Sequence, residues 1–206
     1  MFDPELLRLV AITDDLRDGR DGLVARARAA ARGGATMIQL RLKDAAPRTQ
    51  VEVARALLAA LPAEVPLIVN DRADVALAAG AAGVHVGADD LPAAALRRVV
   101  PERFIIGASV GCDAEVAGSA GADYVGIGPV FPTGSKADAG DAIGIAEVAR
   151  LAARCALPAV AIGGIDASNA ASVMASGVRG VAVIRAVFAT ADPQGAARAI
   201  RSAIGR

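Results

Sequence analysis

The feature that most constrains the fold is an alternation of short apolar runs with longer segments of helical period, repeated along the whole chain. Most runs are apolar on both faces, as is typical of parallel strands covered by helices. The runs are 9–13, 36–41, 66–71, 83–87, 104–109, 123–131, 158–164 and 180–186. The helices expected between and after them are 21–33, 48–61, 72–80, 92–99, 113–120, 145–155, 168–176 and 193–204.

Eight strand–helix repeats in 206 residues predict an α/β protein, a (β/α)8 TIM barrel that residues 1–206 form as a single domain. A doubly wound open sheet is the alternative. It is less favoured because no GxGxxG motif follows the first run and nothing in that fold explains eight repeats.

Composition limits the class of partner. Lys plus Arg total 22 and Asp plus Glu total 22, so no field of one sign attracts nucleic acid or an anionic membrane. Apolar stretches are interrupted well before bilayer length, and the start of the chain has no basic, signal-like region. Two separated cysteines make neither a disulfide framework nor a zinc site. We expect a cytoplasmic protein with small-molecule substrates, and the sequence leaves its oligomeric state open.

In a TIM barrel, chemistry gathers where the strands end at their carboxyl side. The last two apolar runs end in glycines 163–164 and in Ile184 and Arg185, which suits a phosphate site lined by backbone. Polar residues that close the earlier runs or follow them are Thr13, Asp14, Gln39, Arg41, Lys43, Asn70, Asp71, His85, Asp90, Ser109, Thr133, Ser135 and Lys136.

Gln39, Arg41 and Lys43 alternate, so the period of a strand places all three on one face, which in a barrel is the lumen. Two cations in a lumen need anionic partners, because an unpaired buried charge is costly. One interpretation pairs them with Asp71 and Asp90 in a structural network. The other predicts a bound polyphosphate, with Lys136 also contacting it from across the barrel mouth.

Asp71 and Asp90 follow neighbouring strands, so their carboxylates are expected to converge on one hard cation beside Asn70. Mg²⁺ typically uses one or two carboxylates and completes its shell with water and phosphate oxygens, so we predict a magnesium site. The alternative for Asp90 is an ordinary helix N-cap, because DDLP also resembles the start of a helix.

The remaining candidates leave alternatives open. His85, the sole histidine, is either a packed core residue or a general acid. Ser109 has no nucleophile-elbow motif, so covalent catalysis is not indicated. The loop around Lys136 is either solvated or an anion site. Taken together, anion binders and metal ligands without an evident nucleophile favour a reaction driven by departure of a phosphate-type leaving group.

Eight motifs extend over nearly the whole chain. They are AITD (11–14), QLRLK (39–43), VNDRADVA (69–76), GVHVGADDLP (83–92), IGAS (106–109), GADYVGIGPVFPTGSKAD (121–138), AIGGI (161–165) and GVAVIRAV (180–187). Each motif alone is weak, but together and in this order they are specific. As a set, they resemble the thiamine phosphate synthase family.

The resemblance implies a transferase that condenses 4-amino-2-methyl-5-(diphosphomethyl)pyrimidine with a thiazole phosphate, giving thiamine phosphate and pyrophosphate by a dissociative, Mg²⁺-assisted mechanism. It assigns the metal to Asp71 and Asp90. It assigns the pyrimidine diphosphate to Gln39, Leu40, Arg41, Leu42, Lys43, Asn70, Ser109 and Lys136. It assigns the thiazole phosphate to Thr133, Gly134, Ser135, Gly164, Ile184 and Arg185.

The chain departs from the family pattern at Ala88, Gly111 and Arg185, and the last of these enters the expected monophosphate site. For Arg185 we favour backbone binding of the phosphate with the side chain at the rim. Two other functions remain. A related thiazole tautomerase carries a histidine where this chain has Pro129 and lacks the Asn–Asp pair found at 70–71. A non-catalytic barrel that binds a thiamine precursor would be expected to lack the metal carboxylates.

Overall fold

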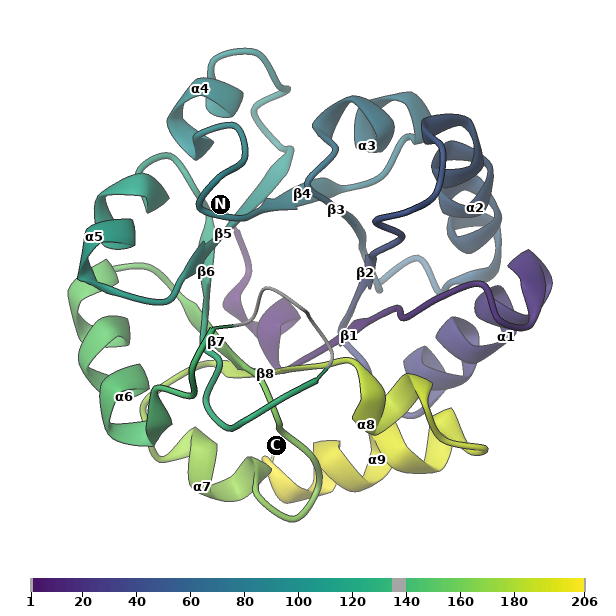
Figure 1. Cartoon of the computed structure of the whole chain (residues 1–206). Helices are drawn as coiled ribbons and strands as arrows, with labels where there is room; N and C mark the ends of the chain where they lie inside the picture. The colour runs from purple at the N-terminus through teal and green to yellow at the C-terminus, as the bar shows by residue number, and fades with distance from the viewer. Residues whose placement is uncertain (1, 135–139, 206) are drawn as a thin grey trace.

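The computed structural model describes residues 2–134 and 140–205. Within these residues, eight parallel strands hydrogen-bond in sequence order and close into a barrel through the pairing of β8 with β1. Seen along the barrel axis, the helices surround the strands (Figure 1). The predicted TIM barrel is confirmed, and the open-sheet alternative is wrong.

Each strand lies inside its predicted run, except that β5 extends one residue further. The strands are β1 Leu9–Ile12, β2 Met37–Leu40, β3 Leu67–Asn70, β4 Gly83–Val86, β5 Ile105–Val110, β6 Tyr124–Ile127, β7 Ala159–Ile162 and β8 Gly180–Val183.

The helices follow the predicted alternation, with two additions that the sequence pattern did not indicate. A short 3-10 helix precedes β1, and the last apolar run becomes helical immediately after β8, because four residues are too few to show a helical period. The elements are η1 Pro4–Leu7, α1 Gly19–Arg32, α2 Pro47–Ala60, α3 Ala73–Ala79, α4 Ala93–Arg97, α5 Asp113–Val116, η2 Ala117–Ser119, α6 Gly144–Cys155, α7 Ala170–Met174, α8 Arg185–Phe188 and α9 Pro193–Ala203.

Local chemistry explains several helix ends. Helices α2 and α9 begin with a proline, whose missing N–H is not needed in the first turn. The Asp192 side chain also caps α9, because its Oδ1 accepts a hydrogen bond of 2.9 Å from the Gly195 N–H. Helix α3 is followed by Gly80, whose φ of 81° is the left-handed conformation that glycine adopts without strain.

Two apolar clusters hold the barrel together. The larger one lies between the strands and the surrounding helices and includes Leu40, Val69 and Val125. The smaller one fills the lumen and consists of Leu7, Val10, Ile12, Met37, Ile68, Tyr124, Val160, Ala182 and Ile184. Because Leu7 of η1 belongs to the lumen cluster, the N-terminal segment packs into the barrel and leaves the opposite end for a site.

Strand register brings polar residues into one row of the lumen. Asn70 of β3 pairs with His85 of β4, His85 pairs with Gly107 of β5, and Gly107 pairs with Tyr124 of β6. Residues paired across parallel strands point to the same side of the sheet. In this row, His85 and Tyr124 lie on either side of Gly107, which has no side chain.

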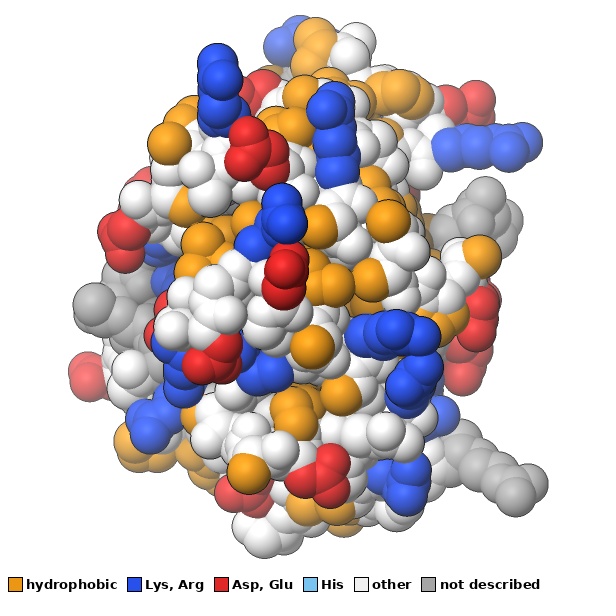
Figure 2. All heavy atoms as spheres, turned by 90° about the vertical axis from the view of Figure 1, so that its right-hand side faces the viewer, with side chains coloured by type: hydrophobic (Ala, Val, Ile, Leu, Met, Phe, Trp, Pro, Cys, Tyr) orange, Lys and Arg blue, Asp and Glu red, His pale blue; other side chains and the backbone are white. Residues whose placement is uncertain are grey.

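The outer surface shown in Figure 2 carries Lys and Arg side chains interspersed with Asp and Glu, and single apolar side chains lie between them. This mixture on the face of the barrel nearest α1 and α2 matches the zero formal net charge of the chain. Among the described residues, none of the helices combines the length and apolar character that a membrane span requires.

Candidate active site

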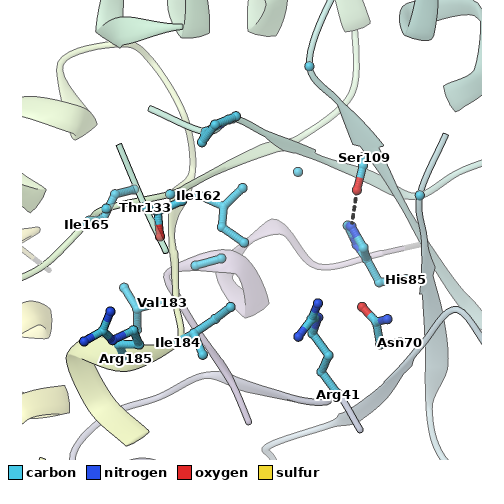
Figure 3. A pocket seen from close by; sticks show the side chains of 18 of the residues that line it. Arg41, Asn70, His85, Ser109, Thr133, Ile162, Ile165, Val183, Ile184 and Arg185 are labelled. Carbon is cyan, nitrogen blue, oxygen red and sulfur yellow. Dashed lines mark hydrogen bonds between the residues drawn. The ribbon is translucent and has the colours of Figure 1, made fainter. Parts of the chain in front are cut away.

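A cavity of about 730 Å³ opens at the carboxyl ends of the strands, within the usual size range of small-molecule sites. Figure 3 shows two groups of labelled side chains facing each other across it. Arg41, Asn70, His85 and Ser109 lie on one side, and the other side holds Thr133, Ile165, Val183, Ile184 and Arg185.

Arg41 follows β2 and reaches into the cavity (Figure 3). Its backbone N–H donates a hydrogen bond of 2.9 Å to Oγ1 of Thr13, a residue fully buried after β1, which fixes the base of the side chain. The guanidinium Nε is buried and finds no hydrogen-bond acceptor among the described residues. Arg8 and Arg26 also have a buried Nε without an acceptor among the described residues, but of the three arginines only Arg41 lines the cavity. The guanidinium of Arg41 therefore fits an anionic ligand.

Asn70 of β3 is held by Gln39 of the neighbouring strand β2. Gln39 Nε2 donates a hydrogen bond of 2.8 Å to Asn70 Oδ1, so the Asn70 amide nitrogen is the group that it presents as a donor. Gln39 is buried and supports Asn70 instead of lining the main cavity. Leu40 and Leu42, which were predicted for the diphosphate site, are buried in the outer apolar cluster, and neither lines the cavity.

Asp71 and Asp90 face each other at the rim, together with Lys43, which also lines the cavity. Asp71 has a φ of 62° and its N–H donates to the His85 carbonyl at 2.8 Å, so the chain turns sharply where β3 ends. Asp90 Oδ2 accepts a 2.7 Å hydrogen bond from the Gly87 N–H. Burial, and next the charge of Asp90, raise the pKa of Asp71 to about 6. Two facing carboxylates of this kind are stabilised by a cation between them.

The donor set fits Mg²⁺. Asp71 and Asp90 face each other and would supply two protein carboxylates. Residues 2–134 and 140–205 contain no convergent group of three or more His, Cys, Asp or Glu side chains. Mg²⁺ is commonly held by one or two carboxylates, with water and substrate phosphate oxygens completing its octahedron.

His85 is buried, and both of its ring nitrogens make hydrogen bonds. Nε2 lies 3.1 Å from Oγ of Ser109, and Nδ1 lies 3.1 Å from the hydroxyl oxygen of Tyr124 (Figure 3 shows the first bond). The sequence interpretation missed Tyr124. The signal available was a phenol in an otherwise aliphatic run that ends at the cavity.

Backbone groups of two loops contribute to the opposite side of the cavity, beside the side chains shown in Figure 3. The loop after β6 is tied to the loop after β7 by hydrogen bonds from the Val130 N–H to the Ile162 carbonyl, 2.9 Å, and from the Phe131 N–H to the Gly163 carbonyl, 3.1 Å. Gly164 has a φ of 65°, and a Cβ there would lie 2.7 Å from that of Phe131. Glycine is therefore required, and its backbone is open to the cavity.

Thr133, Gly134 and Arg185 line this same side. Arg185 is exposed at the start of α8, and its Nη1 lies 3.9 Å from the place that a Cβ on Gly134 would occupy. Its side chain therefore leans along the rim toward the loop after β6. Ser135 and Lys136, two residues predicted for the site, lie outside the described residues.

Two acidic side chains differ from what the strand-end pattern predicts. Asp14, one of the polar residues noted at the strand ends, pairs with Arg17 and Arg26 and is absent from the cavity lining. Glu115 was not predicted, yet its Oε2 accepts a hydrogen bond of 2.6 Å from the Gly111 N–H at the cavity wall. Glu115 lies in the short helix α5 after β5. The sequence argument selected polar residues at the carboxyl ends of the strands, so it did not include this residue.

Comparison with known proteins decides the family. The family model described as thiamine monophosphate synthase matches residues 9–187. A thiamine-phosphate synthase from Xanthobacter autotrophicus is 49% identical, covering 99% of this chain and 98% of that protein. One from Methanoculleus marisnigri is 51% identical over 86% of each chain. The chain belongs to this family.

The solved structures agree. The thiamine phosphate pyrophosphorylase from Pyrococcus furiosus superimposes with a TM-score of 0.86 at 37% identity, covering 98% of this chain and 96% of that one. A 3-hexulose-6-phosphate synthase superimposes with a TM-score of 0.73 at 19% identity and shares the fold alone. Membership of the thiamine monophosphate synthase family makes the chain an enzyme of the thiamine-phosphate synthase class. The residue assignments that the resemblance implied stay predictions.

Proposed function

We propose that the enzyme condenses 4-amino-2-methyl-5-(diphosphomethyl)pyrimidine with a thiazole phosphate and releases pyrophosphate. One observation carries the proposal. A single cavity has cations and a pair of carboxylates on one side and a backbone cradle on the other, so it offers places for two anionic substrates at once.

The diphosphate belongs on the side of Arg41, where a buried guanidinium N–H has no acceptor among the described residues. Lys43, the Asn70 amide and the Ser109 hydroxyl line the same side and add donors. Lys136 is the further cation that the sequence predicts there. When bound at Asp71 and Asp90, Mg²⁺ would neutralise negative charge on the diphosphate.

The proposed reaction needs little proton chemistry from the protein. The bond between the methylene carbon and the diphosphate oxygen breaks, and its electron pair leaves with pyrophosphate. The aminopyrimidine ring delocalises the resulting cation, and the thiazole nitrogen then forms the new C–N bond with its lone pair. Arg41, Lys43 and the amide of Asn70 stabilise the charge that builds up on the leaving group.

The thiazole phosphate belongs on the opposite side. Gly134 and Gly164 allow close approach to the backbone, Thr133 offers a hydroxyl, and Ile184 with Arg185 closes the end of β8. The site has the character of a phosphate cradle made by the last loops of a TIM barrel. This arrangement holds the nucleophilic ring across the cavity from the diphosphate.

The direct experiment is incubation of the purified chain with both substrates and Mg²⁺, with detection of thiamine phosphate. We expect product only when both substrates are present. Failure to form product while both substrates bind would support a non-catalytic binding protein, and isomerisation of the thiazole substrate alone would support the tautomerase alternative.

Metal removal should stop the reaction. Because Asp71 and Asp90 are the two facing carboxylates of the cavity, we expect excess EDTA to abolish turnover and added Mg²⁺ to restore it. Thermal melting in the same buffers controls for unfolding. Full turnover in excess chelator would contradict the metal assignment.

Arg185→Ser should have a small effect. Since the side chain is exposed at the rim, we expect the KM for the thiazole phosphate to change by less than about fivefold, or roughly 1 kcal/mol. A direct charge-assisted contact with the phosphate would instead be worth about 1.5–3 kcal/mol. A rise of tenfold or more in this KM, with the KM for the diphosphate unmoved, would show that the arginine binds the phosphate.

A further inference from the structure

The lumen contains a hydrogen-bonded series, Tyr124–His85–Ser109, that the proposed reaction does not itself require. The hydroxyl oxygen of Tyr124 lies 3.1 Å from His85 Nδ1, and His85 Nε2 lies 3.1 Å from Ser109 Oγ. Ser109 lines the cavity, whereas the tyrosine is 1% exposed in the apolar cluster of the lumen. The series therefore connects the barrel interior to the substrate site.

The sequence makes room for this series at two glycines. A Cβ on Gly107 would lie 2.3 Å from Cζ of Tyr124 and 2.5 Å from Nδ1 of His85. A Cβ on Gly126 would lie 3.1 Å from Cε1 of the histidine. Gly107 pairs with both partners in the strand register, so the two rings meet across the space where its side chain would be.

The position of the imidazole proton follows from the burial of the phenol. Burial raises the pKa of Tyr124, so its hydroxyl stays protonated and must donate to an acceptor. Among the described residues, the partner of that hydroxyl is His85 Nδ1. If Nδ1 carried a proton, the phenol O–H would remain buried without an acceptor. Nδ1 is therefore the acceptor, and in the neutral ring the proton lies on Nε2.

The proton on His85 Nε2 also determines whether the Ser109 hydroxyl accepts or donates in their hydrogen bond. When Nε2–H donates to Ser109 Oγ, it uses an acceptor lone pair of the hydroxyl and leaves the serine O–H to donate elsewhere. The serine borders the cavity on the side of Arg41 and Asn70 (Figure 3). An acceptor on the substrate at that side, such as a diphosphate oxygen, meets a donor that is already oriented.

We propose that Tyr124 is a positioning residue, which fixes the tautomer of His85 and thereby presents the Ser109 hydroxyl as a hydrogen-bond donor to the diphosphate substrate. The tautomer itself is a property of the free protein. Only the identity of the acceptor rests on the proposed function.

The tautomer is measurable without substrate, because His85 is the only histidine of the chain. We expect NMR of ¹⁵N-histidine-labelled protein, at a pH where the imidazole is neutral, to show a protonated Nε2 and an unprotonated, hydrogen-bonded Nδ1. Tyr124→Phe should remove the hydrogen-bond shift of Nδ1. A proton on Nδ1 in the wild-type protein, or an Nδ1 resonance unchanged by Tyr124→Phe, would overturn the inference.

Steady-state kinetics test whether Tyr124 acts on the diphosphate substrate through Ser109. Tyr124→Phe should lower kcat/KM for the pyrimidine diphosphate about three- to tenfold, the range of one hydrogen bond, and leave the KM for the thiazole phosphate unchanged. In a Ser109→Ala background, the same change should have no further effect. Independent, multiplicative losses would show that the tyrosine does not act through the serine.

Phe2→Leu is the matched control, because Phe2 stacks on the Tyr124 ring with 5.6 Å between centroids and has no polar side-chain atom that could bond to the hydroxyl. We expect its Nδ1 resonance and its kcat/KM to match the wild-type values. If Phe2→Leu reproduced the Tyr124→Phe losses at equal melting temperature, ring packing would explain them and the inference would fail. If wild-type protein made no thiamine phosphate, the proposed function would fail, whereas the NMR result would still decide the tautomer.

Discussion

Asp71→Asn should lower kcat by about two to three orders of magnitude, or roughly 3–4 kcal/mol of transition-state stabilisation, and leave the fold intact. The amide keeps the shape of the side chain but loses the charge that offsets a bound cation. Asparagine also tolerates a left-handed backbone, and Asp71 has a φ of 62°. The measurement is steady-state turnover at saturating Mg²⁺ and substrates, together with a thermal melt.

The melting temperature of Asp71→Asn gives a second, independent expectation. Because Asp71 is partly buried and faces Asp90, its ionised form is disfavoured in the folded state, so loss of the charge should not lower the melting temperature in metal-free buffer. Asp74→Asn is the matched control, since Asp74 is exposed on α3 and pairs with Arg72 away from the cavity. Turnover of Asp71→Asn within a few-fold of the wild-type value would remove Asp71 from the metal site.

Arg41→Met should weaken the use of the pyrimidine diphosphate about 10- to 100-fold in kcat/KM, as expected for loss of a charge-assisted contact of about 1.5–3 kcal/mol. The reason is the buried guanidinium Nε, which has no acceptor within the described part of the chain. Methionine keeps an unbranched apolar stem and removes the guanidinium and its charge. The KM for the thiazole phosphate should stay near its wild-type value, because Arg41 lies across the cavity from that site (Figure 3).

Arg150→Met controls for the loss of an arginine in general. Arg150 lies on α6, where it is exposed and pairs with Glu147 and Asp113, and it does not line the cavity. We expect its kinetic constants to match the wild-type values. An Arg41→Met enzyme with unchanged kcat/KM for the diphosphate would instead support the structural-network interpretation of the lumen cations.

Much of the site was predictable because a parallel barrel gathers the carboxyl ends of all strands at one rim. Alternation along the second strand placed Arg41 at the cavity, and the apolar run before Asn70 and Asp71 placed both at the end of β3. The facing of Asp71 and Asp90 was foreseen from strand adjacency, and the structure brings them together.

Other features depend on information that a sequence pattern does not hold. The contact between Tyr124 and His85 follows from the register of three strands and from the missing side chain of Gly107. Helix α8 has only four residues, which are too few to show a helical period in the sequence. The predicted apolar run 180–186 therefore extends past the end of β8 at Val183 and into this helix. The support of Asn70 by Gln39 required knowing which lumen layer each occupies.

If this cavity joins two substrates, the amounts of thiamine phosphate formed and pyrophosphate released must match, and measuring their ratio is the direct test. With both substrates and Mg²⁺, we expect one pyrophosphate for each thiamine phosphate, and no pyrophosphate when the thiazole phosphate is omitted. Release of pyrophosphate without thiamine phosphate would show that the protein is a diphosphate hydrolase and not a condensing enzyme.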